Sequence, residues 1–346
     1  MDLDLVFLGT SGSAPTANRA PPALLVRRGG DRLLFDCAEG TQRQLMRSTI
    51  GLPDLEEIFI SHFHADHYLG LPGMLKTFQL RQRETPLTIY GPHGLNDLFA
   101  GLRRVFGRVS YPLELVEVRP GEALERDGYR ILVFPVDHGV AAVGYAVDEH
   151  ERPGRFDNAA ADALGVPFGP ERGALQRGES ITLADGRVLT PAAVVGPARA
   201  GRRIVISGDT APVETVRALA EGADVLVHEA TFTEDDRERA ADTMHSTALQ
   251  AAEVAQDAAV RLLALTHVSP RYFGPELARE AREVFPATVV PRDFDVIEVP
   301  FAERGSPTLV RGGAKPDRRL GTVSDAAVVS EGKMRPDGPV ADTGCD

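Results

Sequence analysis

The sequence is poor in cysteine and lysine and contains no tryptophan. Its two cysteines, Cys37 and Cys345, lie far apart, which excludes a framework of disulfide bonds and favours a reducing, cytoplasmic compartment. No apolar run approaches the roughly 18 residues of a membrane-spanning helix. The N-terminus lacks the basic and apolar regions of a secretory signal. We therefore expect a cytoplasmic protein with no membrane partner.

Positive charge is also scarce. The 346 residues carry 50 acidic and 38 basic side chains, a net charge of −12. This balance argues against a protein that coats nucleic acid by bulk electrostatics, although a local basic patch would still permit such binding. With 43% hydrophobic residues, the chain can bury a substantial core in one large domain or two.

The periodicity of apolar residues predicts a strand-rich first half and a second half that alternates strands with helices. This order is typical of an α/β layered sandwich. Strands are expected over residues 2–8, 23–26, 33–36, 57–60, 87–90, 113–118, 123–126, 130–136, 143–148, 203–207, 224–228, 262–265, 288–290 and 294–299, and helices over 39–47, 73–82, 94–106, 212–221, 246–258 and 275–285.

Two segments break this pattern. Residues 151–203 are rich in Gly, Pro and Arg, so they read as an excursion from the core, with a local charge of +2. Long segments without strong structure are usually functional or disordered. Residues 305–346 have no aromatic side chain and are rich in Gly, Pro and charge, which predicts a disordered tail after a folded domain of residues 1–304.

The densest group of polar side chains covers residues 61–67, Ser-His-Phe-His-Ala-Asp-His, directly after the apolar run 58–60. That run reads as a buried strand that delivers the following loop to a sheet edge. Three imidazoles and a carboxylate then face one volume. Neutral imidazole with carboxylate suits zinc and its first-row neighbours better than calcium or magnesium. The stretch therefore predicts a metal site.

Further polar residues follow four other predicted strands, at Asp137-His138, Asp209, His228-Glu229 and His267. A single histidine after a strand is more often a structural residue. Catalytic groups in layered α/β folds collect at the carboxyl ends of strands, however, so the repetition favours one shared site.

These motifs resemble a known family. His-x-His-x-Asp-His over residues 62–67 resembles the hallmark of the metallo-β-lactamase superfamily. The runs 35–42 (Phe-Asp-Cys-Ala-Glu-Gly-Thr-Gln), 207–210 (Ser-Gly-Asp-Thr), 228–231 (His-Glu-Ala-Thr) and 245–247 (His-Ser-Thr) resemble the bacterial ribonuclease Z family, the endonucleases that trim the 3′ ends of tRNA precursors. The resemblance implies an α/β metallo-β-lactamase αββα sandwich with an inserted tRNA-binding arm.

The resemblance also implies two zinc ions (Zn2+) in each subunit. The implied ligands are His62, His64 and His138 for one ion, Asp66, His67 and His267 for the other, and Asp209 as the bridge between them. Two metals arranged in this way generate hydroxide at neutral pH and clamp the attacking and leaving oxygens of a phosphodiester.

Three residues have implied catalytic roles. Asp66 would also accept a proton and orient the attacking water, whereas His245, held by Glu229, would protonate the departing 3′ oxygen. The alternative interpretation of Glu229 and His245 is a cap or an ion pair. The spacing of Thr247 and Gln250 fits a capping box at the start of the next helix.

The excursion 151–203 resembles the arm by which these enzymes grip tRNA away from the active site. Its Gly169-Pro170 pair matches the Gly-Pro turn of that arm, and Arg172 and Arg177 follow it, so all four are candidate substrate-binding residues. Such arms usually act in a homodimer, in which one subunit holds tRNA for the other. A flexible insertion without a ligand is the alternative.

Two positions depart from the family pattern. The loop 15–20 has Arg19 but lacks the second basic residue of the family and the Asn that usually follows this Arg, and Ala38 replaces a common Gly. Neither change touches an implied ligand. Arg19 is a further candidate for substrate binding near the cleavage site.

We therefore predict a zinc-dependent endoribonuclease that removes the 3′ trailer from precursor tRNA by metal-hydroxide attack on a phosphodiester. It would leave a 3′-hydroxyl on the tRNA and a 5′-phosphate on the trailer. One alternative is a metallo-hydrolase of small phosphodiesters or sulfate esters, although such substrates need no remote arm. Another is a non-catalytic RNA-binding subunit, although such a protein could dispense with the seven ligands.

Overall fold

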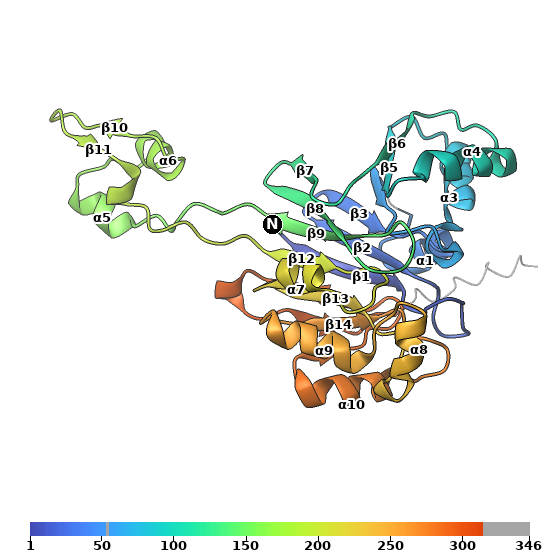
Figure 1. Ribbon diagram of the computed structural model, residues 1–346. Coiled ribbons are helices and arrows are strands. Elements are labelled where there is room, and N and C mark those ends of the chain that lie inside the picture. The colour runs from blue at the N-terminus through green and yellow to red at the C-terminus, as the bar shows by residue number, and fades with distance from the viewer. Residues whose placement is uncertain (53–54, 314–346) are drawn as a thin grey trace, which may run out of the picture. The chain divides into compact units, whose positions relative to one another are not determined.

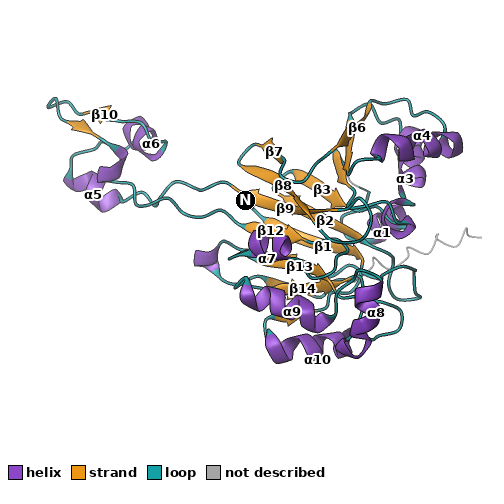
Figure 2. Ribbon diagram, viewed as in Figure 1, coloured by secondary structure: helices purple, strands orange, loops and turns teal. Residues whose placement is uncertain are grey.

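The computed structural model describes residues 1–52 and 55–313, and two β-sheets packed face to face form its centre (Figures 1 and 2). The first sheet has the strand order β17 (Thr308–Val310), β16 (Val296–Glu298), β1 (Leu3–Gly9), β2 (Ala23–Arg28), β3 (Asp31–Phe35), β4 (Glu57–Phe59), β5 (Leu87–Gly91) and β6 (Leu113–Glu117). The second has the order β15 (Thr288–Val289), β14 (Leu263–Thr266), β13 (Val225–Glu229), β12 (Arg203–Ile206), β9 (Val143–Glu149), β8 (Tyr129–Pro135) and β7 (Ala123–Arg126).

The side-chain alternation of strand β1 shows why the layers stack. Leu3, Leu5 and Phe7 point into the central core between the sheets, whereas Val6 and Leu8 point to the outer helices. Because both faces are buried, the strand reads as a nearly continuous apolar run instead of a strict alternation.

Helices cover the outer face of each sheet (Figure 2). On the first sheet these are α1 (Thr41–Arg47), α3 (Leu71–Leu80) and α4 (Leu95–Phe106), and on the second α7 (Glu214–Ala220), α9 (Ala248–Asp257) and α10 (Gly274–Val284). Two further short helices are α2 (Ala65–Tyr68) and α8 (Arg237–Asp242), and short 3-10 turns cover Glu234–Asp236 and Ala302–Arg304. The predicted αββα sandwich is therefore confirmed, and the predicted strands and helices shift by at most two residues at their ends.

Residues 151–203, called the arm below, are inserted between β9 and β12, which are hydrogen-bonded neighbours in the second sheet (Figure 1). The arm contains α5 (Asn158–Ala163), α6 (Pro170–Gln176), the short strands β10 (Ile181–Thr182) and β11 (Val188–Leu189), and a 3-10 turn over Pro191–Ala193. These elements bury a small hydrophobic cluster of their own around Ala161, Val166 and Leu175. The arm is therefore a folded insertion, although its short apolar runs predict little regular structure.

The end of the folded domain lies beyond the expected boundary. The prediction of a disordered tail from residue 305 is wrong for residues 305–313, because β17 pairs antiparallel with β16 and Leu309 packs against the central core. A three-residue strand carries too short a periodicity to be recognised from sequence. The rest of the predicted tail, residues 314–346, lies outside the described residues. No helix in the described part of the chain is long and apolar enough to cross a membrane.

Candidate metal centre

The histidine-rich loop after β4 lies at the edge where strands β8, β12 and β14 also end. Five groups of side chains there have potential ligand atoms within 4.8 Å of one another, and three of the five consist only of implied ligands. These three are His62, His64 and His138; Asp66, His67 and His267; and His62, His67 and Asp209. The structure thus brings all seven implied ligands together, with Asp209 sharing neighbours with both histidine groups.

Asp209 occupies the middle of this arrangement and is 3% exposed. Its Oδ2 atom lies 3.2 Å from Nε2 of His67 and 3.1 Å from Nε2 of His267, and 3.8 Å from Nε2 of His62. Burial opposes the ionisation of this carboxyl, but the imidazoles of His267 and His67 outweigh that effect and hold its pKa well below the ordinary value. One ionised oxygen therefore faces both histidine groups.

Residues outside the cluster fix the first pair of imidazoles. His67 Nδ1 donates to Asp36 Oδ2 at 2.8 Å, and His62 Nδ1 lies 3.0 Å from the hydroxyl of Ser61. That hydroxyl donates to the same Asp36 oxygen at 3.0 Å. With Nδ1 engaged in this way, the Nε2 lone pairs of both rings point into the cluster, which is the form that a metal binds.

The other side of the cluster has a matching set of contacts. His138 Nδ1 donates to the carbonyl of Met244 at 2.9 Å, and His267 Nδ1 donates to the hydroxyl of Thr231 at 2.8 Å. That hydroxyl donates in turn to Glu229 Oε2 at 2.6 Å. Both imidazoles are thereby oriented with Nε2 toward Asp209.

Two of these imidazoles have a buried ring nitrogen that could bind a cation. The Nε2 atoms of His62 and His67 are buried and, among the described residues, have no hydrogen-bond partner. A buried acceptor without a partner costs free energy unless another group satisfies it. For His62, burial and the neighbouring His67 lower the pKa well below its ordinary value, so the ring is neutral. Imidazoles beside ionised carboxylates are a donor set that fits a divalent first-row metal.

Backbone strain concentrates at the same place. Ser13, Asp36, Met244 and His267 all have φ between 54° and 61°, a region that residues other than glycine rarely adopt. The amide of Ser13 donates to Asp66 Oδ2 at 2.9 Å, and the other three residues make the contacts described above. These conformations therefore serve to aim atoms at the cluster.

The candidate catalytic pair lies beside the metal ligands. His245 Nδ1 is 2.7 Å from Glu229 Oε1, and the His245 ring lies 4.8 Å from that of His138. Burial lowers the pKa of His245, but the Glu229 carboxylate outweighs this and raises it to about 9. The ion pair expected as the alternative interpretation is thus present, and it adjoins the cluster. The expected capping box of Thr247 and Gln250 is confirmed.

One residue of the predicted shared site lies elsewhere. The expectation that His228 joins the strand-end cluster is wrong, because β13 alternates its side chains between two faces. Glu229 faces the cluster, whereas His228 shares its side of the sheet with Leu226 and Ala230, which pack under the outer helices. The His228 ring lies buried there, and its Nδ1 contacts the carbonyl of Glu229 at 2.8 Å.

Sequence reasoning gave no role to Asp36, Ser61, Thr231 or the carbonyl of Met244. Asp36 and Thr231 stand inside the family motifs, so the signal for them was a polar residue directly after a strand. The contribution of Met244 comes from its backbone, which leaves no trace in residue type.

The five predicted substrate-binding residues lie outside the metal cluster. Gly169 (φ 139°) and Pro170 begin helix α6, Arg172 pairs with Asp162 inside the arm, and Arg177 pairs with Glu179 at 3.0 Å. Arg19 donates from Nη1 to the Thr10 hydroxyl at 2.7 Å and to the Pro291 carbonyl at 2.8 Å.

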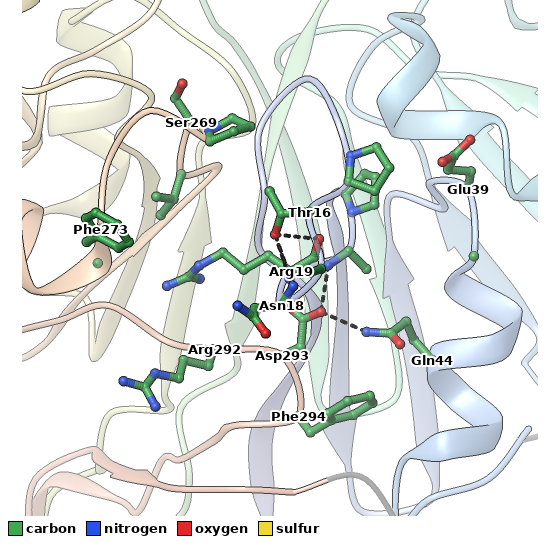
Figure 3. A pocket seen from close by; sticks show the side chains of 18 of the residues that line it. Thr16, Asn18, Arg19, Glu39, Gln44, Ser269, Phe273, Arg292, Asp293 and Phe294 are labelled. Atoms are coloured by element: carbon green, nitrogen blue, oxygen red, sulfur yellow. Dashed lines mark hydrogen bonds between the residues drawn. The ribbon is translucent and has the colours of Figure 1, made fainter.

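Arg19 also lines a cavity of about 1160 Å³ (Figure 3). Arg292 and the exposed ring of Phe273 stand near it in this view, and Arg43 and Arg47 complete the basic lining. The cavity adjoins the metal cluster through Val268, which follows His267 in the chain. A basic, partly aromatic cavity beside a metal centre suits a nucleic acid strand.

The paired sheets and the histidine–aspartate cluster define a metal hydrolase of the metallo-β-lactamase fold. A family model described as "Beta-lactamase superfamily domain" matches residues 177–268, and one described as "Anti-Pycsar protein Apyc1" matches residues 3–103. Human tRNase Z, short form, superposes with a TM-score of 0.64 at 26% identity over 86% of this chain and 100% of that one. YhfI of Bacillus subtilis has the same TM-score and coverage at 20% identity and shows the fold alone.

Sequence relatives identify the family within this fold to which the chain belongs. A ribonuclease Z of Halorubrum lacusprofundi is 46% identical over 308 residues, which cover 88% of this chain and 99% of the relative. A ribonuclease Z of Gemmatimonas aurantiaca is 45% identical over 88% of this chain and 98% of the relative. The chain belongs to the ribonuclease Z family. The relatives include many from halophilic archaea, so the narrower expectation of a bacterial group is not supported.

Proposed function

We propose that this chain is a zinc-dependent endoribonuclease that removes the 3′ trailer from precursor tRNA. Its products would be a tRNA with a 3′-hydroxyl and a trailer with a 5′-phosphate. The identity of about 45% with ribonuclease Z proteins over most of their length carries the proposal. The donor set supports a metal-dependent reaction, because it combines imidazoles with carboxylates.

Two zinc ions would fit the donor set. His62, His64 and His138 would hold one ion, Asp66, His67 and His267 the other, and Asp209 would serve both. When bound, such a metal pair supplies a nucleophile at neutral pH and neutralises the charge that develops on the phosphodiester.

The remaining steps belong to side chains of this protein. The pKa of Asp66 is raised by burial, but its hydrogen bond with His267 and the nearby imidazole of His67 bring it below the ordinary value. Asp66 is therefore ionised and able to orient a water by accepting its proton. The amide of Ser13 holds this carboxylate in place.

His245 supplies the proton for the leaving group. Its raised pKa keeps the ring protonated at neutral pH, and Nδ1–H is engaged by Glu229. The proton at Nε2 is then available for the departing 3′ oxygen of the tRNA. Glu229 acts by holding the ring, since its second oxygen is occupied by Thr231.

RNA would be held in two places. The cavity around Arg19 would receive the strand at the cleavage point, and the arm would bind the tRNA body through the Gly169-Pro170 turn with Arg172 and Arg177. An arm that projects from one subunit and serves another would require a homodimer.

The test is incubation of the purified protein with a precursor tRNA that carries a 3′ trailer, with and without a chelator. We expect a single cut after the discriminator region that disappears with the chelator and returns with added Zn2+. Cleavage of a small chromogenic phosphodiester without cleavage of the precursor would instead favour a small-molecule hydrolase. A chain that binds RNA and neither binds metal nor cuts would favour a non-catalytic subunit.

A further inference from the structure

The arm is joined to the sheets by two chain segments that pair with each other. The amide of Arg152 donates to the carbonyl of Arg199 at 2.7 Å, and the reverse bond measures 2.9 Å. Further out, Phe156 and Val195 form a second bridge, and the amide of Gly196 donates to the carbonyl of Arg155 at 2.9 Å. The two segments therefore form one narrow antiparallel ribbon instead of two independent linkers.

Both segments of this ribbon contact the chain just after β16. The guanidinium carbon of Arg152 lies 3.4 Å from the ring centroid of Phe301. Glu303 Oε1 accepts from Arg152 Nη2 at 3.1 Å and from Arg199 Nη1 at 3.1 Å. One carboxylate thus ties the outgoing and the returning segment to the same short turn. We call Phe301 and Glu303 the root clamp.

The contacts of the root clamp are more exposed than the contacts that hold the sheets together. Arg202, which also lies over the Phe301 ring at 4.0 Å, is buried and pairs with Glu149 at 2.7 Å. The side chains of Arg152, Arg199 and Glu303 are 21–36% exposed and touch no residue of the metal cluster. Their loss would therefore loosen the ribbon without opening the core.

We propose that the root clamp is a positioning device that limits the swing of the arm, and so sets how well the arm and the metal centre can engage one RNA together. The proposal rests on the function proposed above, because it requires the arm to bind RNA. When one ligand spans two sites, its affinity depends on how often both sites are correctly placed. A restrained arm lowers the entropy lost on binding.

Each contact of the clamp is weak by itself. A partly exposed ion pair contributes little to stability, and so does an arginine over an aromatic ring at an exposed site. Glu303 takes part in two such pairs, so a single substitution removes both. The expected consequence is a rise in the KM for precursor tRNA of about fivefold, with kcat little changed.

The experiment compares Glu303→Ala with Glu298→Ala in the full-length, zinc-loaded protein. Glu298 is an exposed glutamate on the neighbouring strand β16 and serves as the matched control. We expect Glu303→Ala to raise the KM for precursor tRNA, to leave turnover of bis(p-nitrophenyl) phosphate unchanged, and to speed hydrogen exchange at the amides of Arg152 and Arg199. Glu298→Ala should change none of these.

Three results would overturn the proposal. One is a KM for precursor tRNA in Glu303→Ala that equals that of Glu298→Ala. Another is an equal loss of activity on the small substrate, which would mean general destabilisation. The third is unchanged hydrogen exchange at the ribbon. Failure of the proposed function is distinguishable, because the unaltered protein would then leave precursor tRNA uncut.

Discussion

At the scale of single residues, the candidate metal cluster depends on partner atoms to which the sequence assigned no role. Each of four imidazoles has its Nδ1 engaged, by Asp36, Ser61, Thr231 or the carbonyl of Met244. These contacts fix the tautomer and the direction of each ring before a metal arrives. The cluster is therefore preorganised by its surroundings as much as by its ligands.

Asp209→Ala should abolish cleavage of precursor tRNA and lower the metal content of the purified protein, while RNA binding persists. The carboxylate removed is the group that faces both histidine sets. Elemental analysis by mass spectrometry, a cleavage assay and a filter-binding assay check these outcomes. His93→Ala is the control, because the His93 side chain is 89% exposed and belongs to none of the ligand groups. Full cleavage by Asp209→Ala would refute the assignment.

Asp36→Ala should lower metal affinity or activity by about 10–100-fold, the usual loss when a partner of a metal-binding histidine is removed. It would leave His67 Nδ1 without its acceptor and the Ser61 hydroxyl without its carboxylate. Competition with a fluorescent zinc chelator measures the affinity. Asp127→Ala, in an exposed turn, should bind metal as the unaltered protein does; equal affinities in both variants would count against this role.

The contrast between His62 and Met244 shows what residue types can and cannot predict. Candidate ligands such as His62 were predictable because metal chemistry restricts the side chain. The carbonyl of Met244 was not, since any residue supplies a carbonyl and only a φ of 54° aims this one. The prediction for His228 was wrong because a histidine at the end of a strand resembles a ligand whichever face it occupies. Only the pairing of β13 decides on which face of the sheet the His228 side chain lies.

At the scale of secondary-structure elements, a buried ion triad ties β2, β9 and the start of β12 together. Glu149 accepts hydrogen bonds from Arg28 Nε at 2.8 Å and from Arg202 Nε at 2.7 Å. All three side chains are less than 10% exposed. Since buried charges are tolerated only when paired, removing one member leaves the others uncompensated.

Glu149→Ala should therefore lower the free energy of unfolding by about 3–5 kcal/mol at pH 7. Urea denaturation followed by circular dichroism measures the loss. Glu125→Ala is the control, because the Glu125 side chain is 61% exposed, although it too contacts a basic residue, His150, at 3.2 Å. A change of less than about 1 kcal/mol in Glu149→Ala, the range typical of exposed pairs, would contradict the triad's importance.

The same triad predicts an acid dependence of stability. Burial raises the pKa of Glu149, but the hydrogen bonds and charges of Arg202 and Arg28 outweigh it and lower the pKa below the ordinary value. A lowered folded-state pKa contributes stability above the unfolded-state pKa of about 4.3, and this contribution is lost as the pH falls further. The stability difference between the unaltered protein and Glu149→Ala should shrink below pH 4. A constant difference down to pH 2.5 would contradict this linkage.

The layers of the fold were predictable from apolar periodicity, because strands of five to seven residues such as β1 and β8 are long enough to show a periodic pattern of apolar residues. The short strand β17 was not, since three residues define no period and its pairing with β16 exists only in three dimensions. The arm was recognised as an insertion from its composition. Its folding was not, because a cluster around Ala161 and Leu175 needs few apolar residues.

At the scale of the whole molecule, the proposed function assigns catalysis to the paired sheets and the grip on the tRNA body to the arm. The protein has a net charge of −12, whereas residues 151–203 carry a charge of +2. An acidic protein with one basic insertion would attract RNA locally, and this attraction would weaken with salt.

Deletion of residues 155–195 should raise the KM for precursor tRNA severalfold and leave hydrolysis of a small chromogenic phosphodiester unchanged. The two chain ends that the deletion would join, Gly154 and Gly196, already lie together. A Cβ atom built on Gly154 would lie only 1.9 Å from the carbonyl oxygen of Gly196. Steady-state kinetics on both substrates, with zinc content measured in parallel, decide the outcome. An equal loss on both substrates would mean that the arm supports the metal centre instead of binding RNA.

The place where the arm is inserted has a consequence for how the protein could change over generations. Strands β9 and β12 are adjacent and antiparallel, so an ordinary short turn could connect them without altering the register of the sheet. The arm is in this sense a removable module. Lineages could lengthen, shorten or exchange it to suit different RNA shapes, while the catalytic layers beneath it stay under separate selection.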